Sequence, residues 1–170
     1  MLSLDLVDKG VVTNQIVLTV GYDKESLADG HYTGEVVCDH YGRKIPKHAH
    51  GTQNLGRHTS STRKITDATM ALFVRIIDKT LLARRLNLTA CNVIREEDIP
   101  EIESYEQISL FDMVEAANAD NNAEEKERAL QEAMLLIKHK YGKNAILKGT
   151  NYTEGATARE RNRSIGGHKA

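Results

Sequence analysis

Residues 15–22 have the sequence Gln15-Ile16-Val17-Leu18-Thr19-Val20-Gly21-Tyr22. Large apolar residues at the even positions alternate with smaller or more polar residues at the odd positions. A period of two residues is typical of a β-strand that packs one of its faces on a core. We therefore expect a strand with one buried face and one more polar face.

Two segments farther along the chain alternate in the same way. In residues 48–54 the polar side chains share one side of a predicted second strand, namely His48, His50, Thr52 and Asn54. In residues 84–94 the side of a predicted third strand that faces the core carries Leu86, Leu88 and Ala90, and the opposite side carries Arg85, Asn87 and Thr89. Both segments therefore have a polar face of their own.

A helix is predicted between these two strands. The cluster at residues 59–62 is Thr-Ser-Ser-Thr and offers several N-cap residues. Apolar residues then recur at helical spacing, namely Ile65, Ala68, Leu72, Phe73, Ile76 and Ile77. Because such a helix covers one face of a sheet, we expect the α+β class: a small, mostly antiparallel β-sheet backed by helices.

Shorter elements are predicted on either side of the first strand. Leu2, Leu6 and Val7 indicate the last turns of an amphipathic helix that ends at Gly10. Residues 23–46 are rich in glycine and lack periodicity, which predicts a long loop or a hairpin that uses residues 35–38. Loops of this length usually have a function.

The composition excludes several classes of protein. Of the 170 residues 40% are hydrophobic, with no Trp and two Phe, so the core must be aliphatic. No apolar run approaches the roughly 18 to 20 residues that span a bilayer, and the N-terminus lacks the pattern of a signal peptide. Cys38 and Cys91 cannot form a disulfide framework. We expect a cytoplasmic protein that does not enter a membrane.

Charge is segregated along the chain although the net charge is −1. Basic and acidic residues number 2 and 5 in residues 1–30, 11 and 4 in 31–95, 2 and 13 in 96–132, and 8 and 2 in 133–170. The four net charges are therefore −3, +7, −11 and +6. The basic block that contains the predicted sheet is the candidate for nucleic-acid binding.

The same boundaries organise the chain into segments. Residues 1–95 form the predicted DNA-binding domain, 96–122 an acidic linker, 123–142 an amphipathic helix and 143–170 a basic, flexible tail. The last 20 or so residues are expected to lack structure of their own. Asn122 and Glu125 resemble a capping box at the start of the helix. Its apolar stripe needs a partner surface and consists of Leu130, Ala133, Met134 and Ile137.

The uncovered face of the predicted sheet carries groups that suit phosphates. Those predicted on the face are Thr19, His48, His50, Thr52, Arg85 and Asn87, and those at its edges are Arg43, Lys44, Lys47, Arg57 and Arg63. Hydroxyl, amide and guanidinium groups contact phosphate oxygens without reading base sequence. We expect binding to the DNA backbone, with an ordinary solvated sheet face as the alternative.

A second interpretation concerns the histidines and one cysteine. Cys38, His40, His48 and His50 are residue types that zinc accepts, but their spacing is irregular. Histidines that face phosphates from a basic loop explain them better, so we expect no metal and no cofactor. A metal-dependent nuclease that uses Asp39 and His40 is the enzymatic alternative.

Residues 107–111 lie in the acidic segment and end in an apolar pair, Leu110 and Phe111. The full sequence of the stretch is Gln107, Ile108, Ser109, Leu110 and Phe111. Bacterial proteins that bind the DNA sliding clamp share a motif of this form, and the segment resembles it at all five positions. Leu110 and Phe111 would fill an apolar pocket while the Gln107 amide forms a hydrogen bond at its rim. We expect docking on the clamp, and the alternative is that the segment folds back onto its own domain.

Longer stretches resemble the C-terminal part of Y-family translesion DNA polymerases, in the UmuC-like branch of Gram-positive bacteria and their phages. They are residues 13–23 (TNQIVLTVGYD), 40–52 (HYGRKIPKHAHGT), 84–88 (RRLNL), 154–162 (EGATARERN) and 165–170 (IGGHKA). The resemblance covers essentially the whole chain. It implies that residues 1–95 are a little finger, a β-sheet backed by two helices that lies along duplex DNA, and that a clamp-binding peptide follows.

The chain also lacks parts that the family has, and these differences predict lower stability and no catalysis. Its little finger is built as β-α-β-β-α-β, and the first strand and the start of the first helix are absent here. If the sheet has the ferredoxin-like order, the absent strand is an interior one, and the chain should be marginally stable or self-associate. The palm, which holds the catalytic metal ions, is also absent, so we expect no catalytic residue and no enzyme activity from this chain alone.

Two functions are consistent with these features of the sequence. The first is a non-catalytic part of a translesion polymerase in DNA repair and the SOS response, which binds damaged or primed duplex DNA and the sliding clamp at the nucleoid. The second is a stand-alone interaction protein that occupies the clamp and competes with polymerases. The catalytic part of the polymerase and an SOS accessory protein are further candidate partners.

Overall fold

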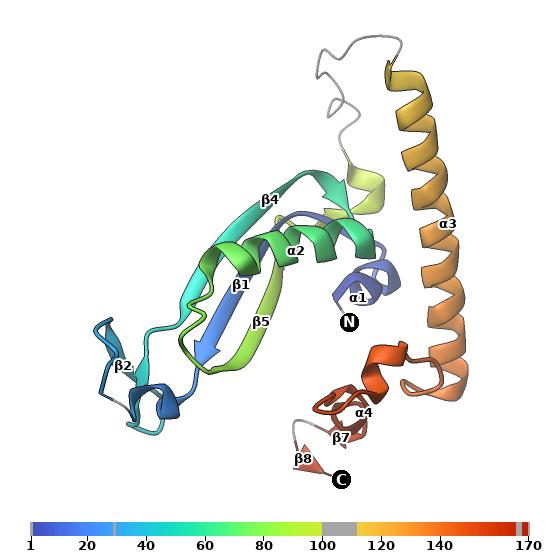
Figure 1. The fold of residues 1–170 in the computed structure, drawn as a ribbon. Coiled ribbons are helices and arrows are strands. Elements are labelled where there is room, and N and C mark those ends of the chain that lie inside the picture. Colours follow the sequence, from blue (N-terminus) through green and yellow to red (C-terminus); the bar gives the residue numbers. More distant parts are fainter. Residues whose placement is uncertain (1, 29, 100–111, 166–167, 170) are drawn as a thin grey trace. The chain divides into compact units, whose positions relative to one another are not determined.

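The computed structural model describes residues 2–28, 30–99, 112–165 and 168–169 (Figure 1). The chain divides into two compact units, Met1–Ile108 and Ser109–Ala170. The first unit contains the predicted sheet and its covering helices. The second contains a long helix and several short elements. The α+β class with a mostly antiparallel sheet is thereby confirmed.

Strand β1 (Val11–Tyr22) is the central strand of the sheet. It is antiparallel to β4 (Ala49–Thr59) on one side and to β5 (Ala83–Cys91) on the other. The short strand β6 (Ile94–Arg95) also pairs with β1, at Val11 and Val12. This pairing explains why β1 begins at Val11, four residues before the predicted start at Gln15.

The predicted single strand over residues 84–94 is wrong, because the chain bends between β5 and β6. Asn92 has φ 51°, in the left-handed region that asparagine tolerates better than most residues. Its Nδ2 donates a hydrogen bond to Asn14 Oδ1 at 3.1 Å, which holds the bend against β1. Leu88 and Ala90 pack on the core as predicted, whereas Leu86 is 59% exposed and joins neither core cluster.

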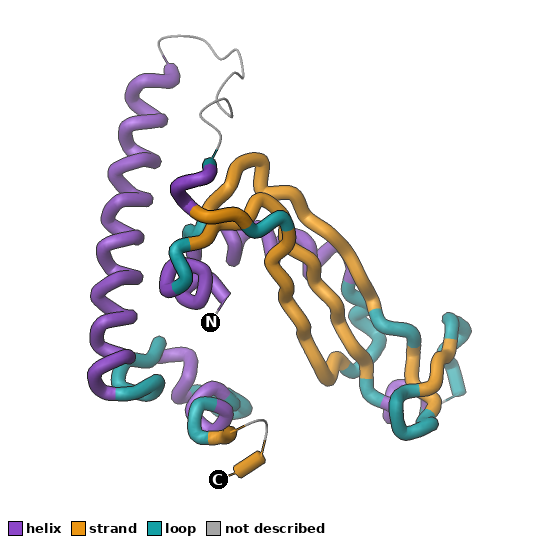
Figure 2. Tube along the Cα trace, turned by 180° about the vertical axis from the view of Figure 1, so that it is seen from behind, coloured by secondary structure: helices purple, strands orange, loops and turns teal. Residues whose placement is uncertain are grey.

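Helix α2 (Thr62–Ile76) covers one face of the sheet, as predicted (Figure 1). The Oγ of its N-cap, Ser61, accepts a hydrogen bond from the Lys64 amide. Leu72 is fully buried in a core cluster whose other buried members come from β1, namely Leu18, Val20 and Tyr22. Figure 2, viewed from behind, shows the three strands in front of α2, so this helix leaves the opposite face uncovered.

A second core cluster joins α1 (Leu2–Asp8) to the sheet and to α2. Leu6 packs with Ile16 of β1 and Ile65 of α2, and Leu2 lies against this group. The helix is followed by Gly10 at φ 62°, a conformation that favours glycine. The predicted helix end at this glycine is therefore confirmed.

Helix α2 approaches β4 closely at Gly51. A Cβ atom at this position would lie 2.8 Å from Leu72 Cδ1 and 2.9 Å from Ile76 Cγ2. Real Cβ atoms do not tolerate such contacts, so the space that glycine leaves open is filled by the helix. The absence of a side chain at Gly51 therefore sets the depth at which α2 packs on the sheet.

The segment between β1 and β4 forms the predicted hairpin. After the 3-10 helix η1 (Lys24–Leu27), strand β2 (Val36–Cys38) pairs with β3 (Lys44–Pro46). At the turn the Gly42 amide donates to the Asp39 carbonyl at 3.0 Å, and Gly42 has φ 73°. A turn followed by a left-handed glycine is a common three-residue hairpin loop.

Strand β4 is longer than the predicted residues 48–54, because its pairing with β1 resumes after a bulge. The register passes from Gln15 opposite Asn54 to Thr13 opposite Thr59. Residues 55–58 form the excess on β4, with Gly56 at φ 79°. A bulge of this kind bends an edge strand and redirects its side chains.

The expected gap at an interior strand position is not found in the described sheet. Because β1 pairs directly with both β4 and β5, every position between the two outer strands is occupied. The ferredoxin-like arrangement with one strand missing is therefore wrong for this sheet. The backbone groups of β1 have partners on both sides. The expected marginal stability or self-association stays a prediction.

In the second unit, helix α3 (Asp112–Tyr141) begins well before Asn122, where the sequence pattern placed its start. Residues 112–122 include Ala116, Ala117 and Ala119, and alanine has the highest intrinsic helix propensity. The acidic character of this stretch was therefore misleading. The helix ends at Tyr141, and Gly142 follows with φ 92°, as predicted.

Short elements lie in the last 20 or so residues, where the sequence predicted no regular structure. They are η3 (Gly149–Tyr152), α4 (Ala158–Arg161) and an antiparallel pair, β7 (Ser164–Ile165) with β8 (His168–Lys169). Asn162 Nδ2 donates to Asn144 Oδ1 at 2.8 Å, and Asn144 Nδ2 donates to the Arg159 carbonyl at 3.3 Å. These two hydrogen bonds join Asn144 to the segment around α4.

Candidate nucleic-acid interface

The open face of the sheet is built from the odd-numbered residues of β1 and their neighbours. Along β1 the residues of the covered face are buried, namely Ile16, Leu18, Val20 and Tyr22. Strand geometry turns Gln15, Val17, Thr19 and Gly21 to the other side. The register then places one residue of β4 and one of β5 beside each position up to Thr19.

Three rows of residues cross this face. They are His50-Thr19-Asn87, Thr52-Val17-Thr89 and Asn54-Gln15-Cys91, each written in the order β4, β1, β5. In the first row, Thr19 Oγ1 and His50 Nδ1 form a hydrogen bond of 3.1 Å. His50, Thr52, Asn54, Asn87 and Thr89 are exposed. Hydroxyl, amide and imidazole groups therefore lie side by side over three strands.

Arg85 supplies a positive charge at one end of these rows. It lies opposite Gly21, which has no side chain, and its Nε donates to Asn87 Oδ1 at 3.2 Å. Among the residues that the structure describes, Arg85 forms no ion pair. Its guanidinium therefore keeps most of its donors for an external anion.

The structure brings six of the predicted DNA-binding residues to the open face or its end. Thr19, His50, Thr52 and Asn87 lie in the rows and Arg85 at their end, and His48 precedes β4 with its ring centroid 6.5 Å from that of His50. Thr89 and Gln15 belong to the same surface and were missing from the predicted set. Alternation had already placed Thr89 on the polar face of its strand, and the same alternation in residues 15–22 turns Gln15 to that side.

The predicted basic edge is less uniform than expected. Lys47 Nζ lies 2.6 Å from Glu35 Oε2, and Arg43 Nη2 lies 2.6 Å from Asp39 Oδ2. Both positive charges therefore have carboxylate partners. Lys44 forms no ion pair with any described residue. Arg57 lies in the bulge of β4, at the far end of that strand from His50.

Arg63 does not lie at an edge of the open face as predicted. It belongs to the first turn of α2, which covers the opposite face of the sheet. The helix that begins at Thr62 instead carries it to the covered side.

The residues considered for a metal do not gather into a site. Within the described part of the chain, no three His, Cys, Asp or Glu side chains are close enough together to hold a metal ion. Asp39, considered for a nuclease, has its carboxylate bonded to Arg43 and to the Tyr41 amide. The side-chain hydrogen bond from Arg43 lowers the pKa of Asp39. This carboxylate organises the hairpin turn.

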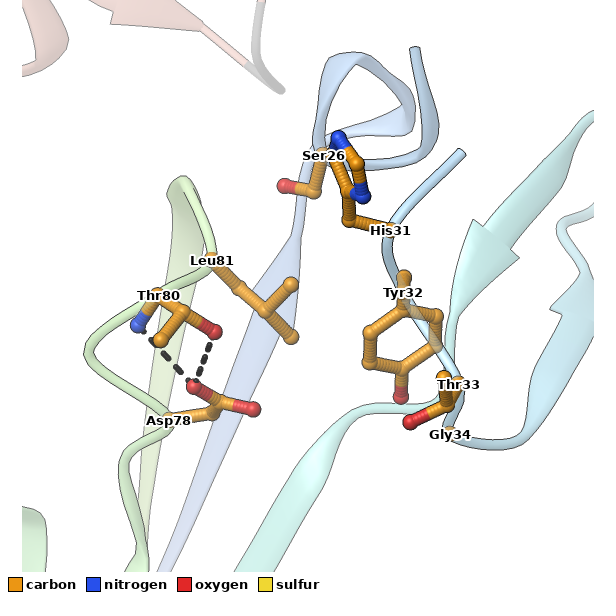
Figure 3. Close-up of a pocket in the computed structure, with 8 residues that line it drawn as sticks. All are labelled: Ser26, His31, Tyr32, Thr33, Gly34, Asp78, Thr80 and Leu81. Atoms are coloured by element: carbon orange, nitrogen blue, oxygen red, sulfur yellow. Dashed lines mark hydrogen bonds between the residues drawn. The ribbon is translucent and has the colours of Figure 1, made fainter. Parts of the chain in front are cut away.

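A pocket of about 500 Å³ lies beside the hairpin (Figure 3). Its lining includes His31, Tyr32, Leu81 and Asp78, whose Oδ1 accepts hydrogen bonds from the Thr80 amide and hydroxyl. These hydrogen bonds lower the pKa of Asp78, which is therefore ionised at neutral pH. Because a carboxylate repels phosphates, this pocket is not an extension of the candidate nucleic-acid interface.

The predicted clamp-binding motif, Gln107 to Phe111, lies outside the described residues. It therefore stays a prediction from the sequence. In the helices that the structure describes, none has both the length and the apolar composition needed to cross a membrane.

The fold and the candidate interface together define an α+β domain with one helix-covered sheet face and one open, polar sheet face. No family model and no solved structure matches the chain. The sequence is 31% identical over 160 residues to a protein of Bacillus subtilis (strain 168) named "Putative UV-damage repair protein UvrX". The alignment covers 94% of this chain, which spans 30% of the length of that curated relative.

Proposed function

We propose that this chain acts in DNA repair as the DNA-binding and clamp-docking region of a UmuC-like translesion polymerase. The observation that carries the proposal is the open sheet face, where the rows His50-Thr19-Asn87 and Thr52-Val17-Thr89 lie next to Arg85. The similarity to UvrX along almost the whole chain supports the repair role. The chain spans 30% of the length of that relative, so the similarity supports repair and not the activity of a whole protein.

The chemistry of the face favours the backbone of DNA over its bases. Threonine hydroxyls, the Asn87 amide and the Arg85 guanidinium all donate to phosphate oxygens. A sheet face bearing such groups binds duplexes of any sequence, because phosphates are common to all of them. A polymerase that passes over damaged template needs this kind of contact.

The second part of the proposal is docking on the bacterial sliding clamp through Gln107 to Phe111. The two apolar side chains of the motif act as anchors, and the acidic residues around it keep the peptide away from DNA. We assign no catalytic residue to this chain. Nucleotide transfer is the task of carboxylates and metal ions in the palm of the family.

The alternative function is a clamp-binding protein that competes with polymerases without binding DNA. The match at all five positions of the motif favours this alternative, because clamp binding through residues 107–111 does not require the sheet to bind DNA. The two functions predict different behaviour toward primed duplex DNA at low salt.

The test measures affinity for primed duplex DNA as a function of salt concentration. Binding should weaken steeply from low to moderate salt, as expected for several phosphate contacts. Replacing both Arg85 and Asn87 with Ala should lower affinity at least about tenfold and reduce the salt slope by about one. Arg63→Gln is the matched control, since this arginine begins the helix on the covered face.

Two outcomes would contradict the proposal. If the chain does not bind duplex DNA at low salt but binds the clamp, the alternative function is favoured. If Arg63→Gln weakens DNA binding as much as the change at Arg85 and Asn87, the interface has been assigned to the wrong face.

A further inference from the structure

The C-terminal unit contains a second polar pocket, separate from the sheet. Its volume is about 300 Å³, and polar or charged side chains make up most of its lining, including Asn151, Thr153, Arg159, Glu160 and Arg163. The pocket is lined by residues of η3, of α4 and of the segments next to them. The side chain of Thr153 is held by a hydrogen bond from its Oγ1 to the Thr150 carbonyl at 2.8 Å.

Two arginines face this pocket without a carboxylate partner. The Arg159 guanidinium lies over the Tyr152 ring, with Cζ 4.9 Å from the ring centroid. Stacking orients a guanidinium while leaving its N–H groups in the ring plane available as donors. Neither Arg159 nor Arg163 forms an ion pair with any residue that the structure describes.

The charge of the pocket favours an anion. Arg159 and Arg163 contribute two positive charges and Glu160 one negative charge, so the lining has a net charge of +1. Asn151 adds a side-chain amide that can donate to the same group, whereas the Thr153 hydroxyl already donates to the Thr150 carbonyl. Guanidinium groups match the oxygens of phosphate with paired hydrogen bonds. This is the reverse of the pocket beside Asp78, where a carboxylate would repel phosphate.

We propose that this pocket binds a phosphate group, with Arg163 and the stacked Arg159 as its main contacts. A volume near 300 Å³ is at the lower end for ligand sites and suits a phosphate with part of a sugar. The phosphate can belong to a nucleic-acid strand or to a free nucleotide, since both present the same chemistry. The proposal does not depend on the function of the sheet face.

The test uses the full chain and titrates inorganic phosphate while NMR follows the backbone amides of Asn151 and Thr153. Arg163→Gln should weaken binding about tenfold, since it removes one of two charged contacts. Arg161→Gln is the matched control: it makes the same charge change at the last residue of α4, two residues before Arg163 and outside the pocket lining, and should change the affinity less than twofold. Glu160→Gln should tighten binding, because it removes the only negative charge from the lining.

Three results would overturn the proposal. The first is that phosphate does not shift the amide signals of Asn151 and Thr153. The second is that the changes at Arg161 and Arg163 weaken phosphate binding equally. The third is that Glu160→Gln binds phosphate more weakly than the parent. A 5′-phosphorylated oligothymidine and a deoxynucleoside triphosphate are then compared with inorganic phosphate, and tighter, Arg163-dependent binding of one identifies the source. The double change at Arg85 and Asn87 should leave phosphate binding here intact, which separates this site from the sheet.

Discussion

The Asp39 carboxylate organises the turn of the hairpin through four contacts. It accepts hydrogen bonds from the Tyr41 amide and the Arg43 amide, each at 2.9 Å, and from Arg43 Nε at 2.8 Å. Arg43 Nη2 lies 2.6 Å from its second oxygen. The hydrogen bond from the Arg43 side chain lowers the pKa of Asp39 and raises that of Arg43.

We predict that the Asp39 pKa lies below its ordinary value of 3.8 and that Arg43→Gln moves it back toward that value. Because the folded-state pKa is lowered, the stabilisation is complete above the ordinary value and is lost as pH falls through the folded pKa. Carboxyl NMR titration measures both values. Asp78 is the internal control, since its pKa is lowered by Thr80 and should not respond to Arg43→Gln.

At the scale of elements, the contact between β4 and α2 depends on Gly51. Alanine there would place its Cβ less than 3.0 Å from both Leu72 and Ile76, and valine would add two more methyl groups. We expect Gly51→Val to lower the free energy of unfolding by about 1 to 3 kcal/mol, because an overpacked core forces side chains or backbone to move. Denaturant unfolding measures this difference.

Gly21 on β1 provides the matched comparison for Gly51. A Cβ at Gly21 would lie 3.6 Å from Arg85 Cβ, an ordinary van der Waals distance, on the open face. Gly21→Ala should therefore change stability far less than Gly51→Ala. Equal losses at the two glycines would show that α2 does not pack against β4 as described.

At the scale of the whole molecule, the two proposed binding activities should be separable. Replacing Leu110 and Phe111 with Ala removes two apolar anchors, each worth about 2 kcal/mol at a typical hot spot. Together these losses weaken clamp binding by roughly a thousandfold and leave DNA affinity unchanged. The double change at Arg85 and Asn87 should have the opposite pattern.

Both affinities should be measured for both variants by a surface-binding assay on the clamp and fluorescence anisotropy on primed duplex DNA. If the Leu110 and Phe111 variant binds the clamp like the parent, the motif does not dock there. If it loses DNA binding as well, the two activities share one surface.

Local side-chain patterns determined most of the first unit. The alternation from Ile16 to Tyr22 predicted which face of β1 is buried, and the spacing of Ile65 and Leu72 predicted the helix that covers it. The polar side of the residues from His50 to Asn54 also lies where alternation placed it. These predictions succeed because strand and helix periods are properties of neighbouring residues.

Contacts between distant residues were decided only by the tertiary structure. Sequence alone did not reveal that β5 pairs directly with β1, that Asn92 bends against Asn14, or that Asn162 is bonded to Asn144. The sequence pattern also placed Arg63 at an edge of the open face, and it did not show that Lys47 pairs with Glu35. The physical reason is that strand pairing, ion pairs and side-chain hydrogen bonds join groups whose separation in space does not follow from their separation along the chain.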